Sequence, residues 1–372
     1  MQPIPIVRPT LPALDRIHSA LRRALVSGQV TRGRNVQALE SDAARRLGVR
    51  HAVAVSSCTS GLMLVLRALD LKGEVILPSF TFLATGTSVL WCGLTPVFAD
   101  VDPETATVDP ADVERRITRR TRAILAVHTF GAPADCDRLE RIARRHRVKL
   151  VFDAAHGFGC RWRGRPVGGF GDAEVFSMSP TKLVVAAEGG LVTTDDAALA
   201  RRIRIGREYG NPGNYDCEFP GLSARFEEFN AILARWGLRT LEAHATARRR
   251  LAARLRRRLA DVPGVGFQRV PDGGAHGYKD LSLEIDPAAF GTTRDGLAAA
   301  LARQGIDSRK YYFPLVHETR AFRAWRARTG PRDLPGSYRL SRNSLSVPLW
   351  SHMPPAVMDR IGDAIAAAGR RK

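Results

Sequence analysis

Apolar residues follow two patterns along the first two-thirds of this chain. Short continuous apolar runs, such as the one that begins at His51, predict strands that are buried on both faces. Between these runs, apolar residues recur every three or four positions, which predicts amphipathic helices. The first such helix places Leu14, Leu21 and Leu25 on one face, and Gly28 is its stop signal. The chain therefore alternates strands with helices.

The predicted elements of this region follow one another through short connections. We predict helices at 11–27, 36–47, 60–69, 82–92, 110–117, 135–146 and 196–207, and strands at 51–57, 74–78, 96–100, 123–128, 149–153 and 190–194. Strands that are apolar throughout and separated by helices indicate an α/β fold with a mainly parallel sheet. Catalytic groups gather beyond the carboxyl ends of such strands, and the predicted strand ends carry Ser57, His128, Asp153 and Ser177.

The pattern changes after this region. A long helical segment from about 226 to 259 leads to a strand near 280–285 and to helices at 292–305 and 354–369. The length of 372 residues also exceeds the usual size of a single hydrophobic core. We therefore predict a large domain at 1–240 and a small C-terminal α+β domain at 241–372.

The chain is strongly basic, with 57 lysine and arginine residues, 37 acidic residues and a formal net charge of +20. Such a charge is compatible with a nucleic-acid partner. The arginines, however, are spread along helical segments such as 247–258, where Leu251 and Leu255 lie four positions apart. That spacing predicts one apolar face and a solvated basic face. We therefore expect an anionic small-molecule substrate rather than nucleic acid.

Three other classes are disfavoured by the sequence. No apolar run approaches the roughly 18 residues needed to span a bilayer, and the N-terminal segment lacks the basic and apolar regions of a signal peptide. The cysteines are scattered, without a Cys-x-x-Cys pair or a metal-ligand spacing, at positions 58, 92, 136, 160 and 217. They predict free thiols in a reducing cytoplasm and no metal site.

Lysine is rare in this basic chain, which draws attention to Lys182. The lysines are at positions 72, 149, 182, 279, 310 and 372. Arginine cannot lose its proton in a protein, whereas a desolvated lysine can, and the free amine can attack a carbonyl group. Lys182 follows an apolar run and precedes the glycines of residues 188–190, so we predict that it forms a Schiff base. The alternative is a solvated surface lysine.

Residues 56–61, with the sequence SSCTSG, form a turn of small residues between a predicted strand and a predicted helix. Backbone N–H groups and the positive end of the helix dipole suit this turn to binding a phosphate. The alternative is ordinary capping of the helix by serine or threonine. The turn is neither a Walker A loop nor a Rossmann glycine motif, which disfavours nucleoside triphosphates and dinucleotides as ligands.

Asp153 ends the predicted strand at 149–153. A carboxylate at such a position needs a cationic partner, and the ring nitrogen of pyridoxal phosphate (PLP) would serve as one. The alternative is a cap for the next helix. His156 follows three residues later and is a candidate hydrogen-bonding neighbour of the same ring, since no second ligand lies at a metal-coordinating spacing.

Two aromatic residues and a serine complete the candidate set. Phe80 and Phe82 follow the strand at 74–78, and either could stack on a flat heterocycle or pack in the core. Ser177 lies five residues before Lys182, within reach of the phosphate of a cofactor that this lysine holds. Its alternative role is a strand-end serine bonded to the backbone. Together the candidates supply a phosphate cradle, a ring-nitrogen partner, a stacking aromatic and an amine.

At this point the chain resembles the DegT/DnrJ/EryC1/StrS family of PLP-dependent sugar and aminocyclitol aminotransferases, almost from end to end. The matching segments are 33–40 (GRNVQALE), 51–62 (HAVAVSSCTSGL), 78–82 (PSFTF), 95–103 (TPVFADVDP), 127–131 (VHTFG), 153–157 (DAAHG), 176–182 (FSMSPTK), 188–190 (EGG), 221–225 (GLSAR) and 311–315 (YYFPL). As an ensemble, these motifs are highly specific for the family.

The resemblance implies the type I fold of PLP-dependent transferases and a homodimer whose active sites lie at the subunit interface. It also implies PLP as cofactor, with pyridoxamine phosphate (PMP) as an intermediate, and an amino donor such as glutamate or glutamine. The leading acceptor is a keto-deoxy sugar linked to a nucleoside diphosphate. On the family pattern, Lys182 is the catalytic Schiff-base lysine, Asp153 pairs with the pyridine nitrogen, Phe82 stacks on the ring, and Thr59 and Ser177 hold the phosphate.

Four positions depart from the family pattern. Cys58, in the phosphate-binding turn, and Ala187 stand where glycine is usual. His156 occupies a position that is often glutamine. Ser223 replaces the asparagine of a segment that reaches the partner subunit's phosphate, while Arg225 of the same segment is retained. We expect Cys58, His156 and Ser223 to contact the cofactor despite these changes.

Particular residues help to distinguish the predicted aminotransferase from alternative activities. Some family members are sugar 3-dehydratases that hold PMP without a covalent bond and carry histidine where Lys182 stands, so the lysine disfavours that activity. A cyclitol ketone or an amino-aromatic precursor stays open as an alternative acceptor. A non-catalytic regulator that binds nucleic acid is disfavoured by the intact set of Asp153, Ser177 and Lys182.

Overall fold

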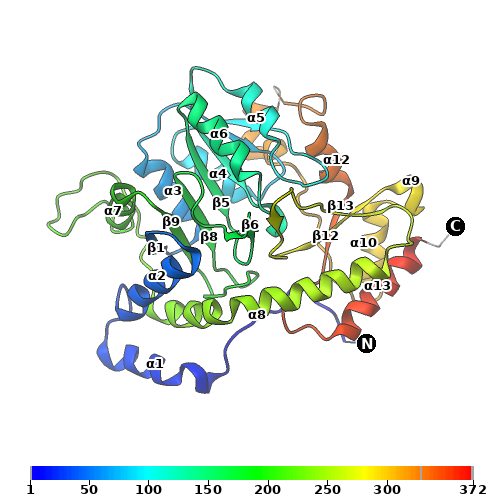
Figure 1. Cartoon of the computed structure of the whole chain (residues 1–372), viewed down its shortest axis with the longest axis horizontal. Helices are drawn as coiled ribbons and strands as arrows, with labels where there is room; N and C mark the ends of the chain where they lie inside the picture. The colour runs from blue at the N-terminus through cyan, green and yellow to red at the C-terminus, as the bar shows by residue number, and fades with distance from the viewer. Residues whose placement is uncertain (1, 327–328, 370–372) are drawn as a thin grey trace.

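The computed structural model describes residues 2–326 and 329–369 and is built around a seven-stranded sheet (Figure 1). The strand order is β1-β9-β8-β5-β4-β2-β3. Its strands are β1 (His51–Val55), β2 (Glu74–Pro78), β3 (Thr95–Ala99), β4 (Thr121–Val127), β5 (Lys149–Ala154), β8 (Ala173–Ser177) and β9 (Gly190–Thr194). The pairs from β3 through β8 are parallel, whereas β9 is antiparallel to both of its neighbours. The predicted α/β class with a mainly parallel sheet is confirmed.

Helices cover both faces of this sheet because alternate side chains of its strands are apolar on both sides. Ala52 and Ala54 of β1 join one hydrophobic core, and Val53 and Val55 join the other. The first core is closed by α2 (Arg34–Leu47), α5 (Pro110–Arg116), α6 (Cys136–His146) and α8 (Glu228–Arg258), and the second by α3 (Cys58–Ala68), α4 (Leu83–Trp91) and α7 (Ala197–Gly206).

The reversed strand β9 gathers several chain segments at one edge of the sheet. Gly190, at the start of β9, lies opposite Val55 at the end of β1 and opposite Ser177 at the end of β8. In the same way, Asp153 of β5 lies between Val127 of β4 and Val175 of β8. The carboxyl ends of the parallel strands therefore meet the loop that precedes β9.

A second, smaller sheet packs against the C-terminal half of α8. It is antiparallel and consists of β10 (Val265–Phe267), β12 (Leu281–Ile285) and β13 (Ser344–Val347). Helix α8 has 31 residues and is therefore about 46 Å long, which carries it from the large sheet to this smaller one (Figure 1). The C-terminal half of α8 packs there with α10 (Arg294–Arg303) and α13 (Pro355–Gly369). The division predicted at residue 240 falls inside α8 and stays a prediction.

The predicted helices and strands are present, with ends that differ by at most three residues. Helix α1 (Leu14–Ser27) ends as predicted at Gly28, whose φ of 68° is left-handed. The sequence did not predict the short sheet β11-β6-β7 or several short elements. These are β6 (Arg161–Trp162), β7 (Arg165–Pro166), β11 (Gly274–Ala275), α9 (Pro287–Phe290), α11 (Arg323–Arg326) and α12 (Pro335–Asn343), together with 3₁₀ turns at Thr129–Gly131, Val316–Glu318 and Arg320–Phe322. The strands β10 and β13 of the smaller sheet were not predicted either.

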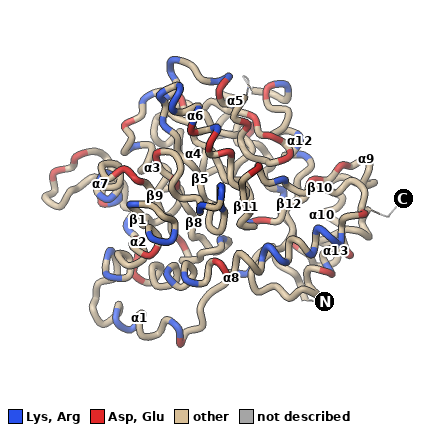
Figure 2. Tube along the Cα trace, in the orientation of Figure 1, with Lys and Arg blue, Asp and Glu red and all other residues tan. Residues whose placement is uncertain are grey.

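Basic and acidic residues are interspersed along the chain (Figure 2). Many arginines form ion pairs, such as Arg254 with Asp359 at 2.6 Å. The helix at 247–258 buries Leu251 and Leu255 as predicted, and Arg248, three residues before Leu251 on the same face, is buried with them at 1% exposure. Within the described residues, no helix is both long and apolar enough to cross a membrane.

Candidate active site

Lys182 lies in the loop between β8 and β9, at the edge where the carboxyl ends of the parallel strands meet. Its backbone N–H donates to the carbonyl of Ser179 at 3.0 Å. The base of the loop is closed by hydrogen bonds of 2.8 Å from Met178 to the carbonyl of Gly189 and from Ala186 to the carbonyl of Met178. These bonds hold the lysine on a short, structured loop.

The Lys182 side chain is partly buried, and burial lowers the pKa of its ammonium group from 10.5 to about 8. The positive charge of Lys279 lowers this pKa as well, while the charges of Asp280 and Asp153 raise it. A pKa near 8 leaves a useful fraction of uncharged amine at neutral pH, which is the form that attacks a carbonyl group. This environment disfavours the alternative of a solvated surface lysine.

Asp153 is buried at the end of β5, where it accepts two short hydrogen bonds. Thr85 Oγ1 donates to Asp153 Oδ2 at 2.7 Å, and the backbone N–H of Ala155 donates to Oδ1 at 3.0 Å. Burial raises the pKa of Asp153, and the two donors and the charge of Lys182 oppose that rise. A cationic N–H placed against this carboxylate would remove the cost of its burial.

His156 is held in one protonation state and one tautomer. Its Nδ1 accepts a hydrogen bond of 3.1 Å from the backbone N–H of Phe130. Burial, followed by the charges of Lys182 and Lys279, keeps the pKa of His156 well below 6.5. The ring is therefore neutral, and Nε2 carries its proton as a donor. The described residues contain no cluster of metal-ligating side chains around it or elsewhere.

The turn before α3 caps the helix, and it also leaves two amide groups without a partner inside the helix. Ser57 and Ser60 form a capping box, in which the Ser57 side chain accepts from the Ser60 amide and the Ser60 side chain accepts from the Ser57 amide, both at 3.0 Å. The amides of Cys58 and Thr59, at the first two positions of α3, have no acceptor within the helix and can bind an anion.

The Cys58 side chain points away from such an anion and into the core. Its Sγ lies 3.4 Å from the carbonyl oxygen of Val175 and 3.8 Å from Asp153 Oδ1. Burial raises the pKa of this thiol well above 9.0, so it stays uncharged. Cys58 therefore contributes its backbone N–H to the turn and its side chain to the surroundings of Asp153.

Gly190 brings β9 into close contact with the same turn. A Cβ atom at this position would lie 2.4 Å from the carbonyl oxygen of Ser57 and 2.7 Å from the amide nitrogen of Cys58. Ala187, three residues earlier, has a φ of 63°, a left-handed conformation that glycine adopts without strain. The glycine that is usual in the family at residue 187 therefore has a conformational reason.

Burial separates the two aromatic candidates. Phe80 is fully buried and packs edge-on against Phe130 and Tyr312, with ring centroids 6.0 Å and 5.3 Å away. Phe82, just before α4, is 57% exposed. Only Phe82 is thus available to stack on a ligand. Ser177 is buried at the end of β8, and its Oγ accepts a long hydrogen bond of 3.4 Å from the Ser179 amide.

Within the described residues, the Ser223 side chain bonds to none of the other predicted site residues. Its exposed hydroxyl accepts a hydrogen bond of 3.0 Å from Tyr209 Oη. The neighbouring Arg225 stacks over the Tyr209 ring at 5.5 Å. The backbone of this segment contacts the turn before α3, because the Ser56 amide donates to the carbonyl of Ala224 at 3.1 Å.

Sequence reasoning missed two groups of residues at this edge. Thr85 holds Asp153, and nothing in the sequence distinguishes it from other helical threonines. Lys279 and Asp280 form a buried ion pair whose charges act on Lys182. The scarcity of lysine that singles out Lys182 applies equally to Lys279 and was a signal that could have found it.

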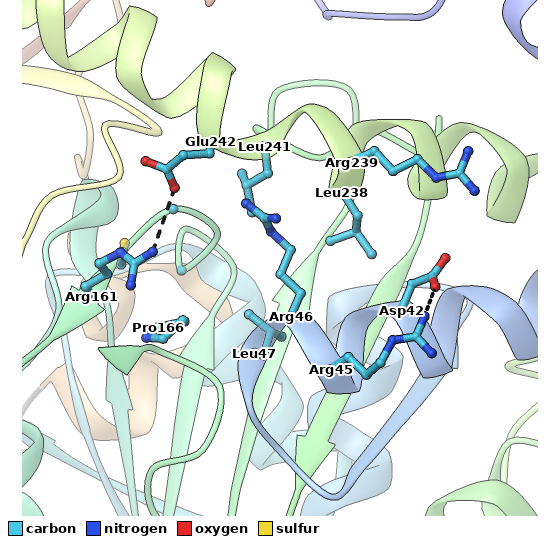
Figure 3. A pocket seen from close by; sticks show the side chains of 13 residues that line it. Asp42, Arg45, Arg46, Leu47, Arg161, Pro166, Leu238, Arg239, Leu241 and Glu242 are labelled. Atoms are coloured by element: carbon cyan, nitrogen blue, oxygen red, sulfur yellow. Dashed lines mark hydrogen bonds and ion pairs between the residues drawn. The ribbon is translucent and has the colours of Figure 1, made fainter. Parts of the chain in front are cut away.

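A cavity of about 610 Å³ lies outside this edge, between α2, α8 and the hairpin β6–β7 (Figure 3). Its acidic residues are both paired, Asp42 with Arg45 and Glu242 with Arg161. None of the predicted site residues lines it. The lining residues are Asp42, Arg45, Arg46, Leu47, Gly157, Gly159, Cys160, Arg161, Pro166, Leu238, Arg239, Leu241 and Glu242. The cavity is therefore separate from the site around Lys182.

The donor set around Lys182 fits pyridoxal phosphate. The buried Asp153 would pair with a cationic N–H, and the N-terminus of α3 would bind an anion. The exposed Phe82 ring could stack on a flat ring. Lys182 supplies an amine of lowered pKa for the aldehyde. These requirements match the ring nitrogen, phosphate, ring and carbonyl group of one molecule.

Comparison with known proteins agrees with this assignment. Residues 14–366 match the model of the DegT/DnrJ/EryC1/StrS aminotransferase family. The chain is 34% identical, over 95% of its length and 94% of the relative's, to UDP-N-acetyl-3-dehydro-α-D-glucosamine 3-aminotransferase of Acidithiobacillus ferrooxidans.

Two solved structures also cover the whole chain. DesI, crystallised in the presence of its TDP-sugar product, is 38% identical with a TM-score of 0.94, and 94% of its chain is covered. DesV of S. venezuelae is 32% identical with a TM-score of 0.91 and is covered completely. The fold is that of PLP-dependent aminotransferases, and the chain belongs to the DegT/DnrJ/EryC1/StrS aminotransferase family.

Proposed function

We propose that this aminotransferase moves an amino group from glutamate or glutamine to the ketone of a keto-deoxy sugar that is linked to a nucleoside diphosphate. The observation that carries the proposal is the meeting of Lys182, with its pKa of about 8, and the buried Asp153 at one edge of the sheet. Relatives support the acceptor class, because one is named for a UDP-linked 3-dehydro sugar and another was crystallised with its TDP-sugar product.

Each candidate side chain has one task in this proposal. Bound PLP withdraws electrons from the carbon that gains or loses a proton and carries the amino group between donor and acceptor. Lys182 Nζ holds the cofactor and, once released, moves the proton. Asp153 keeps the ring nitrogen protonated, and Phe82 supports the ring. His156 donates from Nε2, which its hydrogen bond with the Phe130 amide leaves protonated.

The phosphate has its own set of donors. The amides of Cys58 and Thr59 and the hydroxyl of Ser177 face it from one subunit in this proposal. We assign Ser223 to the phosphate of the partner subunit in a homodimer, since its hydroxyl is exposed and bonded only to Tyr209 among the described residues.

Exposed apolar side chains on the helix that follows Phe82 support the homodimer. Trp91 is 77% exposed and Leu83 46% exposed, and both belong to the same helix, α4, that Phe82 precedes. Large exposed apolar side chains mark surfaces that associate. We also place the enzyme in the cytoplasm, a proposal supported by five cysteines that are all free thiols. Sedimentation of the purified protein tests the dimer, and a monomer would overturn the shared site.

Absorbance spectroscopy tests the role of Lys182. Purified protein with PLP should show the visible band of a lysine-bound cofactor, and Lys182→Ala should abolish it. The matched control is Lys149→Ala, because Lys149 is an exposed lysine at the opposite end of β5 and pairs with Asp172 at 2.7 Å. The control should keep the band. An unchanged spectrum in Lys182→Ala would overturn the assignment.

A coupled amination assay tests the acceptor. Glutamate and glutamine would each be offered with a panel of nucleotide-linked keto sugars and with free cyclitol ketones. We expect turnover with a nucleotide-linked sugar and little with its free sugar, because basic residues would bind the diphosphate. Turnover of a cyclitol ketone alone would replace the proposed acceptor but keep the reaction type.

A further inference from the structure

Phe130 has a left-handed backbone in the short turn Thr129–Gly131, which follows β4. Its φ is 59° and its ψ is −3°, a conformation that costs free energy in a residue other than glycine. The Phe130 side chain is only 1% exposed, and its ring stacks on Tyr312 at a centroid distance of 5.5 Å. A buried residue keeps such a conformation only where the surrounding structure holds it.

Each carbonyl of this turn accepts a hydrogen bond from the segment at 268–280, which lies between β10 and β12 in the sequence. The pairs are Gln268 Nε2 with the Thr129 carbonyl at 3.1 Å, the Asp280 amide with the Phe130 carbonyl at 3.0 Å, and the Gly277 amide with the Gly131 carbonyl at 2.8 Å. The approach is close, since a Cβ atom at Gly131 would lie 2.9 Å from the backbone nitrogen of Lys279. The segment therefore holds the left-handed turn.

Gln268 is the side-chain donor of this set, and its own orientation is fixed by His276. Burial lowers the pKa of His276 to about 3, so its ring is neutral. His276 Nδ1 accepts from the Tyr278 amide at 2.8 Å, which leaves the proton on Nε2, and Nε2 donates to Gln268 Oε1 at 3.0 Å. Gln268 Nε2 consequently faces carbonyl oxygens, that of Thr129 and, at 2.6 Å, that of Thr105.

The turn that Gln268 holds supplies the backbone donor for His156. The Phe130 amide donates to His156 Nδ1 at 3.1 Å, and the direction of this N–H depends on the shape of the turn. Because Nδ1 is thereby an acceptor, the proton of the neutral ring stays on Nε2, which is then a donor. The left-handed turn thus sets the tautomer of a predicted cofactor-binding side chain.

We propose that Gln268 is a positioning residue, which holds the turn Thr129–Gly131 in its left-handed shape and so keeps His156 in the tautomer that donates from Nε2. The inference rests on the proposed function, in which His156 Nε2 donates to the cofactor. Gln268 comes directly after β10 of the smaller sheet, whereas His156 comes directly after β5 of the large one. A residue next to one sheet therefore sets the donor that the other sheet presents to the cofactor.

The tautomer of His156 is the readout of the test, because a hydrogen bond that only stabilises the fold would not change it. Nitrogen NMR of the full-length protein with isotope-labelled histidine rings gives the ratio of the two tautomers, and His156→Gln identifies the His156 signals by their loss. Gln268→Met removes every hydrogen bond of the amide, and Gln268→Glu keeps an acceptor for His276 but no donor. The matched control is Gln37→Glu, since Gln37 is exposed on α2.

Loss of one hydrogen bond changes an equilibrium constant by about threefold to tenfold. The ratio of the Nε2–H tautomer of His156 to the Nδ1–H tautomer should fall by this factor in both Gln268 variants, and it should keep its wild-type value in Gln37→Glu. The affinity of the protein for PLP, measured by equilibrium dialysis, should fall by a similar factor. If the Gln268 variants lose stability in urea but keep the wild-type tautomer ratio, Gln268 is merely structural and the proposal is overturned.

The two measurements also separate this inference from the proposed function. If the wild type binds no PLP, the proposed function fails, while the tautomer ratios still test the action of Gln268 on His156. If the wild type binds PLP and the ratio falls without a loss of affinity, only the positioning role of Gln268 fails. A Gln268 variant that does not fold is replaced by His276→Phe, which removes the donor to Gln268 Oε1 but keeps a ring against Tyr278, where the ring centroids are 3.9 Å apart. We expect a smaller fall of the tautomer ratio in that variant, and an unchanged ratio would overturn the proposal.

Discussion

Replacing Thr85 by valine should lower the free energy of unfolding of the protein by an amount that depends on pH. Thr85 is fully buried, and its Oγ1 donates to Asp153 Oδ2 at 2.7 Å. Valine has the same shape but no hydroxyl, so Asp153 would keep the Ala155 amide at 3.0 Å and the weak thiol contact of Cys58 at 3.8 Å as its donors. A hydrogen bond to a charged group contributes about 1.5–3 kcal/mol.

A second hydrogen bond adds to this magnitude. Thr85 Oγ1 uses its proton for Asp153, so it accepts the hydroxyl of Thr81, which lies 2.9 Å away. In Thr85→Val the buried Thr81 hydroxyl loses that acceptor, at a further cost of about 1 kcal/mol. We therefore expect a loss of about 2–4 kcal/mol at a pH at which Asp153 carries its charge.

The pH dependence follows from linkage. Burial raises the pKa of Asp153 above its unfolded value, and loss of the Thr85 donor raises it further. The folded state then binds the proton more tightly than the unfolded state does, so stability falls as pH rises from about 4 through the folded pKa. The loss in Thr85→Val should accordingly be smaller at pH 5 than at pH 8.

Urea denaturation of the protein without cofactor, at pH 5 and pH 8, measures this difference. Thr85→Ser keeps the hydroxyl and is the matched control, so its loss should depend little on pH. A loss of equal size at both pH values in Thr85→Val would refute the reasoning, because it would mean that the charge of Asp153 does not depend on this donor.

Four further substitutions test other parts of the structure. Ala187→Gly should stabilise the protein by about 0.5–1 kcal/mol in urea denaturation, since relief of the left-handed φ of 63° exceeds the entropy that glycine loses. Gly190→Ala should lower PLP affinity by about tenfold or more in equilibrium dialysis, since its Cβ would meet the Ser57 carbonyl at 2.4 Å and displace the phosphate turn. The stability of the wild type should rise between pH 8 and 10.5, because in that range the unfolded lysine, of pKa 10.5, holds a proton that the folded lysine, of pKa about 8, has lost. Lys182→Met should remove this rise. Arg248→Met should cost about 2–3 kcal/mol in thermal or urea denaturation, because buried carbonyls lose a charged donor. If one of these measurements shows no change in its variant, the structural feature on which that prediction rests is contradicted.

The sequence predicted the elements well because each depends on local patterns. Apolar runs and three-to-four-residue spacing located β1 to β5 and the helices between them to within three residues. The reversed direction of β9 has no such local signal, since an apolar strand has the same pattern in either direction. The order of the sheet therefore had to come from the structure.

The site shows the same limit. Phe80 and Phe82 are the same residue type and lie only two positions apart in the sequence. Only their burial in the structure shows that Phe80 is a core ring and Phe82 an exposed one. Lys279 and Asp280 lie nearly a hundred residues beyond Lys182, and a long-range approach of that kind leaves no trace in spacing. The predicted roles of Lys182 and Asp153 depended on motifs whose residues are close in sequence.

The position of β9 also governs the order in which the protein can assemble. Strand β1 is at the edge of the large sheet, and β9 is its only neighbour there among the described residues. A nascent chain that has emerged only as far as β8 has already made β1 and the phosphate turn, but nothing yet pairs with that strand. The contact between them is of long range, which makes it slow to form. Completion of the turn at Ser57–Thr59 must therefore wait for residues 190–194, so this turn and the end of β8 reach their final packing at the same stage of folding.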